Sequence, residues 1–292
     1  MRVFVTGASG FIGSAVVPEL LEAGHEVVGL ARSDASAAAI TTLGAGVHRG
    51  DLDDLDGLRA AAAASDGVVH LAFVHDFSRY DASLRIDLEA IEAMGTALEG
   101  SDRPFVIASG VGFVALAAGK HPELEARFPR SAAGRRTVQL AEHGVRSVVV
   151  GLPPTVHGAG DHGFIATLVG IAREKGVSGF VGDGSNRWSA VDRFDAAHLF
   201  RLTVERAAAG SVFAATADEG VPLREIAEII GRHVGVPTAS IAPEDAAEHF
   251  GWLGTFVAID TAASSEQTYA QLGWQPTRPG LVEDLEQGHY FE

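Results

Sequence analysis

The sequence contains no cysteine and few tyrosines, tryptophans and methionines. Without cysteine the protein has no disulfide bond, no thiol nucleophile and no thiolate metal ligand. It also lacks any uninterrupted run of about eighteen apolar residues, which a membrane-spanning helix requires. The chain opens directly on a predicted strand, with no charged, cleavable leader in front of it. From these absences we expect a soluble, cytoplasmic protein with no membrane partner.

Basic residues are in the minority. The chain has 22 lysines and arginines against 38 aspartates and glutamates, which gives a formal net charge of −16. The basic residues form no run or stripe, whereas nucleic-acid binding depends on contacts from such residues to phosphates. The composition therefore argues against a nucleic-acid partner. With 292 residues the chain is long enough for one large domain or two small ones.

The most informative stretch is residues 1–13, where a buried-strand pattern runs into a Gly-x-x-Gly-x-x-Gly turn and then an amphipathic helix. Gly7 allows a sharp turn, Gly10 removes a side chain where the backbone approaches a pyrophosphate, and Gly13 lets the helix pack on the sheet. The helix, predicted to begin near Phe11, directs its N-terminal amides and positive dipole end at the anion. The pattern predicts a dinucleotide-binding turn; the alternative is a glycine-rich turn without a ligand.

Strand and helix patterns alternate along the first half of the chain. Apolar strand patterns recur at 2–5, 26–31, 47–49, 67–71, 104–108 and 146–151. This alternation predicts an α/β fold of the Rossmann-like, doubly wound type, with a parallel sheet covered by helices on both faces. After Pro153 and Pro154 the pattern changes to short strands that separate predicted helices near 164–174, 195–206, 223–234, 244–250 and 281–288. We expect a nucleotide-binding Rossmann domain at 1–155, and at 156–292 mainly a smaller C-terminal substrate-binding region packed over the carboxyl ends of the sheet.

The end of the second predicted strand indicates which cofactor the fold takes. It carries Ala31-Arg32-Ser33, with no carboxylate before Asp34, the expected N-cap of the next helix. In dinucleotide folds an acidic residue here binds the ribose 2′-hydroxyl, whereas a cation accommodates a 2′-phosphate. The sequence therefore favours NADP(H), with a solvated surface role for Arg32 as the alternative. Asp51, with Leu52, is expected to bracket the adenine or, equally, to cap the helix that begins near Asp54.

Three segments together, Thr6-Gly-Ala-Ser-Gly-Phe-Ile-Gly13, Gly50-Asp-Leu52 and His70-Leu-Ala72, resemble the extended short-chain dehydrogenase/reductase superfamily of the epimerase/dehydratase type. Further segments resemble an atypical subgroup: 71–78, 109–110, 152–158, 160–164 and 188–193. The resemblance implies that the loops after the fourth, fifth and sixth strands approach the nicotinamide. Proteins of this superfamily are often dimers, so a homodimer is one expectation, and the sequence leaves the oligomeric state open. The expected cofactor-binding residues are Gly7, Ser9, Gly10, Phe11, Ile12, Gly13, Arg32, Ser33, Asp51, Leu52, Leu71, Ala72, Phe73, Ser109, Gly110 and Pro153.

The sequence departs from this superfamily at the catalytic pair. Superfamily enzymes carry Tyr-x-x-x-Lys, in which the lysine lowers the pKa of the tyrosine that exchanges a proton with the substrate. Tyrosine occurs here only at Tyr80, Tyr269 and Tyr290, and no lysine follows at that spacing. The helix expected in that place, residues 131–143, offers Arg130, Ser131, Arg135 and Arg136 instead. The superfamily mechanism is therefore not transferred to this chain.

Histidines are the alternative proton donors, because a histidine titrates near neutrality. His75 follows the fourth predicted strand, and His157 follows the sixth. Ser109 is the third catalytic candidate, since it could hydrogen-bond a substrate oxygen. For each residue the alternative is an ordinary hydrogen-bonded position in a loop or in the core. His157, Asp161 and His162 lie at irregular loop positions, so we expect no metal site.

Aromatic residues gather in the same loops and predict a large, apolar substrate pocket. The expected substrate-contacting residues are Phe73, Phe77, Phe113, His162, Phe164 and Trp188. We therefore expect an oxidoreductase, an NADPH-dependent reductase that transfers a hydride to the C=O, C=N or activated C=C bond of a small, mostly apolar or aromatic substrate. The alternative is an NADP-binding redox sensor similar to NmrA-like proteins, which keep the fold without the tyrosine. The missing tyrosine argues against a sugar-nucleotide epimerase or dehydratase.

Overall fold

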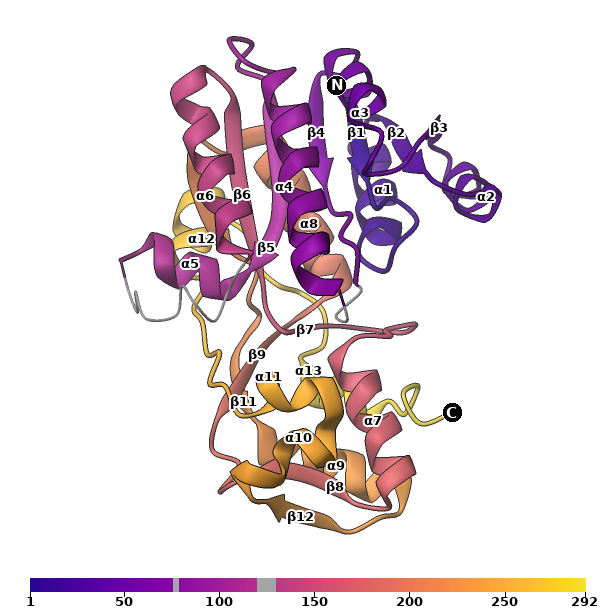
Figure 1. Cartoon of the computed structure of the whole chain (residues 1–292), viewed down its shortest axis with the longest axis vertical. Coiled ribbons are helices and arrows are strands. Elements are labelled where there is room, and N and C mark those ends of the chain that lie inside the picture. The colour runs from indigo at the N-terminus through magenta and orange to yellow at the C-terminus, as the bar shows by residue number, and fades with distance from the viewer. Residues whose placement is uncertain (76–78, 120–129) are drawn as a thin grey trace. The chain divides into compact units, whose positions relative to one another are not determined.

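The structure is a computed structural model that describes residues 1–75, 79–119 and 130–292 (Figure 1). It divides into two compact units. The first comprises Met1–Gly151, Ala196–Ala214 and Glu266–Trp274, and the second comprises Leu152–Asp195, Ala215–Ser265 and Gln275–Glu292. Two segments from the later part of the chain therefore belong to the first unit.

A sheet forms the centre of the first unit. Within the described residues it has seven strands in the order β10-β6-β5-β4-β1-β2-β3. The strands are β1 Arg2–Thr6, β2 Glu26–Ala31, β3 Gly46–Arg49, β4 Gly67–His70, β5 Pro104–Gly110, β6 Arg146–Leu152 and β10 Ser211–Ala214. Val3, Phe4 and Val5 are fully buried, as are Val68 and Val69. Continuous apolar strands form here because helices cover both faces of the sheet, which confirms the predicted doubly wound α/β fold.

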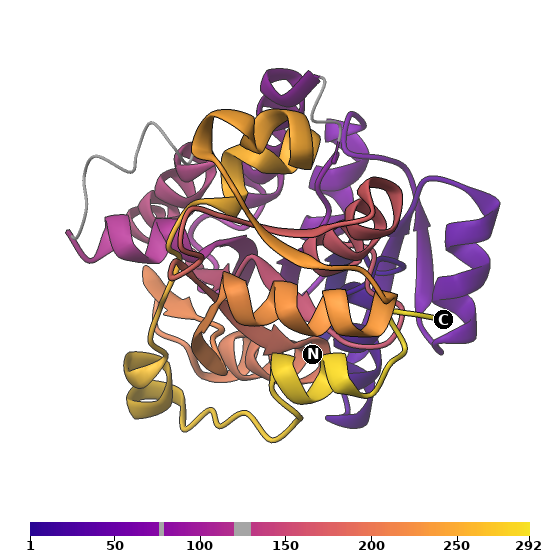
Figure 2. The same cartoon turned by 90° about the horizontal axis from the view of Figure 1, so that it is seen from below.

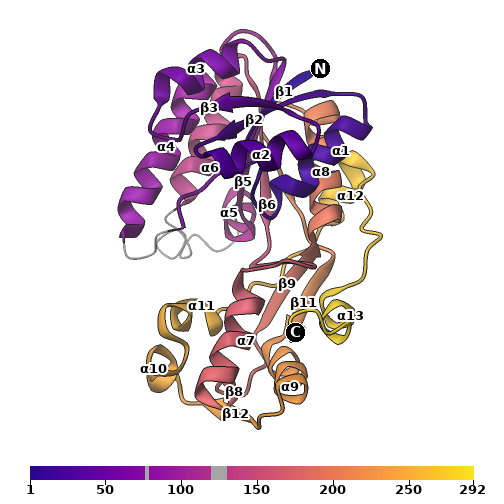
Figure 3. The same ribbon diagram turned by 90° about the vertical axis from the view of Figure 1, so that its right-hand side faces the viewer.

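Helices lie on both faces of this sheet. They are α1 Gly13–Glu22, α2 Asp34–Thr42, α3 Leu55–Ala63, α4 Tyr80–Thr96, α5 Val111–Ala117, α6 Ser131–Gln139, α8 Arg193–Arg206 and α12 Glu266–Leu272, with a 3-10 turn, η3, at Leu140–His143. Figure 3 shows α3, α4 and α6 on one side of the sheet and α1 and α8 on the other. Glu19 of α1 accepts hydrogen bonds from His198 at 2.9 Å and Arg201 at 2.7 Å, which fixes α8 against α1.

The second unit has its own core. Its strands are β7 Thr155–His157, β8 Ser178–Val181, β9 Arg187–Asp192, β11 Asp218–Pro222 and β12 Thr238–Ile241, paired as β11-β9-β7 and β12-β8. Its helical segments are α7 Phe164–Lys175, α9 Leu223–Val234, η4 Pro243–Asp245, α10 Ala246–Phe250, η5 Gly251–Leu253, α11 Gly254–Val257 and α13 Leu281–Glu286. Leu223, Ile226 and Ile230 form the buried stripe of α9, and Figure 2 shows α13 beside this helix.

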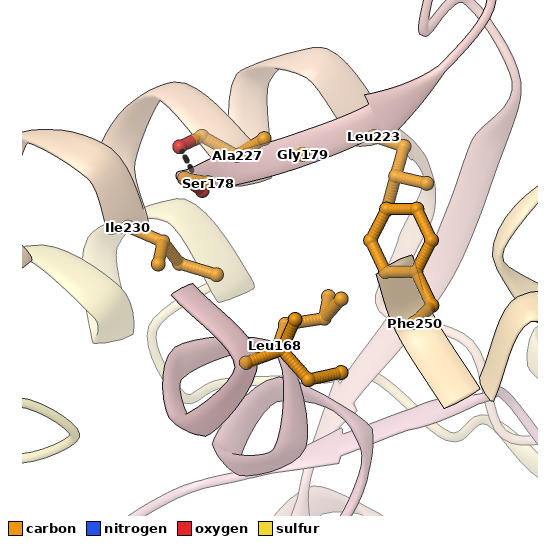
Figure 4. Close-up of a pocket in the computed structure, with 8 residues that line it drawn as sticks. Leu168, Ser178, Gly179, Leu223, Ala227, Ile230 and Phe250 are labelled. Atoms are coloured by element: carbon orange, nitrogen blue, oxygen red, sulfur yellow. Dashed lines mark hydrogen bonds between the residues drawn. The ribbon is translucent and has the colours of Figure 1, made fainter. Parts of the chain in front are cut away.

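A small cavity lies inside the second unit, among α7, β8, α9 and α10 (Figure 4). Its volume is about 10 Å³, and Leu168, Leu223, Ile230 and Phe250 contribute apolar walls. Ser178 Oγ at its edge already donates a hydrogen bond of 2.7 Å to the Ala227 carbonyl oxygen. A space of this size holds about one water at most, and the walls offer that water few polar partners. We therefore treat the cavity as a packing gap and not as a ligand site.

Candidate functional site

The glycine-rich turn connects β1 to α1 through backbone that only glycine accommodates. Gly7 has φ +69°, and a Cβ on Gly13 would lie 2.0 Å from the Gly7 carbonyl oxygen. The Gly10 amide donates to that same oxygen at 2.9 Å, which closes the turn. Ser9 and Gly10 are exposed, and no side chain caps the N-terminus of α1. Exposed turn backbone in front of an uncapped helix fits a dinucleotide pyrophosphate.

The end of β4 lies directly against this turn. A Cβ on Gly7 would approach the Ala72 amide nitrogen to 2.8 Å. Thr6 Oγ1 accepts hydrogen bonds from the amides of Leu71 and Ala72, each at 3.2 Å. The structure therefore brings Leu71 and Ala72, and with them Phe73, next to the predicted phosphate-binding residues.

The carboxyl end of β2 presents Arg32 to solvent. Among the described residues Arg32 forms no ion pair, and its side chain lies at an exposed position. Ser33 is the N-cap of α2, because its Oγ accepts from the Ser36 amide at 3.1 Å. Our prediction that Asp34 caps this helix is wrong: Asp34 lies in the first turn and forms an ion pair with Arg49. Ser33 is the N-cap because its backbone is extended and its short side chain completes a capping box with Ser36.

Asp51 organises the loop after β3. Its Oδ1 accepts from the amides of Asp53 at 3.0 Å and Asp54 at 3.2 Å. Asp54 in turn caps α3, accepting from the Gly57 amide at 3.0 Å. Leu52 is buried in the core of the first unit. Asp51 therefore supports the loop, and its side chain is exposed beside it.

The end of β5 carries Ser109 and Gly110. Ser109 is buried, whereas Gly110 is exposed and is the N-cap of α5. Phe113 on α5 is buried against α6, since a Cβ on Gly134 would lie 2.7 Å from its ring. Phe113 also borders a pocket of about 680 Å³ between α5, α6, β10 and α12. Arg135 lines the same pocket.

A buried polar network runs from β1 to the start of α6. His70 is fully buried, and its Nδ1 lies 2.7 Å from Thr6 Oγ1 while its Nε2 lies 3.2 Å from Asp87 Oδ1. Asp87 also accepts two hydrogen bonds of 3.0 Å from Arg130, through Nε and Nη2. Although burial alone raises the pKa of this carboxyl, the Arg130 charge and the His70 hydrogen bond lower its pKa to about 2. Asp87 is therefore ionised at neutral pH.

Phe73 connects this network to other candidates. The Arg130 guanidinium carbon lies 4.4 Å from the centre of its ring. The His75 ring packs edge-on to Phe73 at 5.2 Å between centroids, and the Tyr80 ring does so at 6.2 Å. Phe77, another predicted substrate contact, lies outside the described residues.

The sequence interpretation missed the parts that Asp87, Arg130 and Tyr80 play in this arrangement. A signal for Asp87 was available: it falls on the helical stripe that also contains Ser83, Ala90 and Met94, all of them buried. An acid on an apolar stripe indicates a buried, paired charge.

The second unit contains the remaining predicted residues. Pro153 is buried, and His157 is fully buried with its Nδ1 3.0 Å from Asp284 Oδ2. Within the described chain the His157 Nε2 has no hydrogen-bond partner. His162 is exposed in the loop that follows.

Carboxyl groups surround His157. Asp161 accepts a hydrogen bond of 2.8 Å from the Tyr290 hydroxyl, and burial raises its pKa. Burial also raises the pKa of Asp192, which pairs in register with His157 across β7 and β9. In the described parts of the chain, no group of three potential ligands has the geometry to hold a metal ion.

Four aromatic residues of the second unit form one group. Phe164, at the start of α7, packs at 5.6 Å from both Trp188 and Trp252 and at 5.7 Å from Phe256. Trp188 is fully buried behind it, whereas Trp252 is 42% exposed. Phe164 and Trp188 were predicted from the sequence; Trp252 and Phe256 were not, because they come from a distant segment of the chain.

Comparison with known proteins identifies related chains. The profile of the NAD dependent epimerase/dehydratase family matches residues 3–118. An uncharacterized protein of Schizosaccharomyces pombe is 46% identical over 295 residues, which cover 100% of both chains. The 2-alkyl-3-oxoalkanoate reductase of Stenotrophomonas maltophilia is 27% identical over 257 residues, or 81% of this chain and 77% of the reductase. The solved structure of MoeE5 in complex with UDP-glucose and NAD is similar in fold, with a TM-score of 0.74 at 22% identity over 100% of this chain and 98% of that one.

No helix in the described residues is long and apolar enough to cross a membrane.

Proposed function

Because the chain belongs to the NAD dependent epimerase/dehydratase family, we propose that it is an NADPH-dependent reductase of a small, mostly apolar or aromatic molecule. The bond reduced is a C=O, C=N or activated C=C bond. The observation that carries this proposal is the exposed glycine-rich turn together with Arg32, which has no acidic partner in the described part of the chain. The reductase name of the Stenotrophomonas relative supports the reaction class.

The first unit would hold the cofactor. The backbone of Ser9 and Gly10 and the N-terminus of α1 would bind the pyrophosphate, and Arg32 would bind the 2′-phosphate. Asp51 would lie beside the adenine, and the loops containing Phe73 and Ser109 would lie beside the nicotinamide. When bound, NADPH supplies the hydride. The protein's own residues orient the substrate, keep water out and deliver a proton, for which His75, Ser109 and His157 are the candidates predicted from the sequence.

The substrate would bind to aromatic side chains. In the first unit the candidate is Phe73, which is half-buried beside the glycine-rich turn. In the second unit a separate candidate is the aromatic group around Phe164, which includes the partly exposed Trp252. Such side chains bind apolar and aromatic molecules more strongly than polar sugars.

We also propose that the protein is a cytoplasmic homodimer. Size-exclusion chromatography with light scattering tests whether it is a dimer.

Arg32→Ala tests the choice of cofactor. Loss of a charge-assisted contact to the 2′-phosphate should raise the NADPH dissociation constant by about 10- to 100-fold, because such a contact contributes about 1.5–3 kcal/mol. The NADH dissociation constant should stay within about twofold, since NADH lacks that phosphate. Arg2→Ala is the matched control, because Arg2 lies at the opposite end of the strands and pairs with Glu26. Fluorescence titration gives both constants; an equal loss for NADPH and NADH contradicts the assignment.

The proposed reduction is tested on the wild-type protein. We would titrate it with NADPH and then add ketones, imines and enones of increasing apolar surface, following the absorbance of NADPH. Oxidation that depends on one of these compounds supports the reductase and identifies the bond reduced. Tight binding without turnover across the set would favour an NADP-binding sensor, and no binding would overturn the interpretation of the turn.

A further inference from the structure

Phe73 is surrounded by three polar side chains at the carboxyl end of β4. Tyr80, the first residue of α4, packs edge-on to its ring with 6.2 Å between centroids, and Arg130 lies over the ring at 4.4 Å. His75 contacts the same ring at 5.2 Å. Ala72, the residue before Phe73, lies against Gly7 of the glycine-rich turn. This group is therefore adjacent to the proposed cofactor site and lies in the same unit.

Arg130 is held in a fixed position. Asp87 accepts two of its hydrogen bonds at 3.0 Å, and the side chain of Asp87 is only 1% exposed. His70 lies 3.2 Å from the same carboxylate and 2.7 Å from Thr6 of β1. The guanidinium is thus anchored through α4 and β4 to the strand that leads into the turn. A cation anchored in this way stabilises a negative charge that develops nearby without first having to reorient.

We propose that Tyr80 is the proton donor of the reduction and that Arg130 is the positioning cation that stabilises the resulting phenolate. The proposal rests on the proposed reductase function. The carbonyl carbon of the substrate takes the hydride and its electron pair from NADPH, and the carbonyl oxygen takes the phenolic proton of Tyr80. The products are the alcohol, NADP⁺ and a phenolate, which regains its proton from solvent.

The electrostatics of Tyr80 fit a donor. Burial raises the pKa of its hydroxyl, the Arg130 charge lowers it, and the Asp87 charge raises it, with a net upward direction. The phenol therefore keeps its proton at neutral pH, as a donor must. Tyr80 comes from α4 and Arg130 from the residue before α6, whereas the tyrosine and lysine of a Tyr-x-x-x-Lys pair lie on one helix.

The coupling of Tyr80 to Arg130 can be measured without substrate or cofactor. The chain has three tyrosines, so protein labelled with ¹³C at the tyrosine Cζ gives three resonances, and Tyr80→Phe assigns one of them. Arg130→Met should move the Tyr80 titration to higher pH, and Arg130→Lys should leave it close to that of the wild type. Arg136→Met is the matched control, because Arg136 lies on α6, the helix that Arg130 precedes, and pairs with Glu92. A Tyr80 titration that does not move in Arg130→Met overturns the pairing.

Kinetics then test the donor role. Tyr80→Phe should lower kcat by about 100-fold or more, while the NADPH dissociation constant stays near the wild-type value. Tyr269→Phe is the control: this tyrosine is 53% exposed on α12 and should leave kcat unchanged. If Tyr80→Phe keeps its kcat, or if His75→Gln alone loses it, Tyr80 is not the donor and the reductase function still stands. If the wild type binds NADPH but reduces nothing, the reductase function falls, and the donor role falls with it.

Discussion

Asp87→Asn tests whether the buried network of the first unit stabilises the fold through its charge. The pKa of Asp87 is lowered from 3.8 to about 2. Its carboxylate is therefore favoured in the folded protein, and a shift of this size corresponds to about 2 kcal/mol of stability. Asparagine keeps the shape of the side chain but leaves the Arg130 cation without its counter-charge. Because breaking a buried pair costs about 3–5 kcal/mol in other proteins, we expect a loss of about 2–4 kcal/mol at pH 7.

The pH dependence of this stability loss distinguishes an electrostatic contribution of Asp87 from a contribution of side-chain packing. A carboxyl with a depressed pKa in the folded state stabilises the protein above its unfolded value, near 4, and this contribution disappears as the pH falls towards 2. The difference in unfolding free energy between wild type and Asp87→Asn should therefore be constant from about pH 7 to pH 5. It should shrink as the pH is lowered from about 4 to about 2.

Urea unfolding at several pH values, followed by circular dichroism, measures this difference. Asp56→Asn is the control, since Asp56 pairs with Arg59 on the surface and should change stability by about 1 kcal/mol at most. If the Asp87→Asn difference stays the same between pH 5 and pH 2.5, the stabilisation comes from side-chain packing, and the electrostatic reasoning is refuted.

Two further variants test other parts of the structure. Gly13→Ala places a Cβ 2.0 Å from the Gly7 carbonyl oxygen, so the turn must shift; we expect NADPH affinity to fall by about tenfold or more, as a fluorescence titration would show, whereas unchanged affinity would exclude this turn as the phosphate site. Asp284→Ala removes the partner of the buried His157 Nδ1 and should cost about 1–3 kcal/mol in urea unfolding. Glu283→Ala, at an exposed position of the same helix, should have little effect, and equal losses in the two variants would show that the His157 contact is not responsible.

Local sequence patterns were sufficient to predict individual strands and helices. The six predicted strands of the first half are all present, and the helix predicted at 223–234 has those bounds in the structure. It is well predicted because its apolar residues recur at helical spacing and Gly235, at φ +78°, ends it. The Asp34 prediction failed because serine and aspartate are both good N-caps, and sequence alone does not decide between neighbours.

The candidate site was predicted only where it is local in sequence. Gly7 to Gly13 lie within one turn, so their spacing in the sequence is enough to predict a dinucleotide-binding turn. The contacts of Phe73 with Arg130, and of Asp87 with His70, join residues from different elements, and no periodicity indicates which of these elements meet. The same holds for Ala196–Ala214 and Glu266–Trp274, which belong to the first unit although they follow 44 or more residues of the second in the chain. Pairing of this kind depends on tertiary packing.

The position of the buried network bears on its purpose. An apolar group of similar volume often stabilises a protein as well as a buried ion pair does, because desolvation offsets the attraction. Stability alone therefore does not explain why Asp87, Arg130 and His70 are polar. Their location does distinguish them: the network ends on Phe73, one residue beyond the backbone that packs against the glycine-rich turn. A fixed cation at that place would stabilise the negative charge left when a nearby hydroxyl releases a proton during reduction, and an apolar group would not.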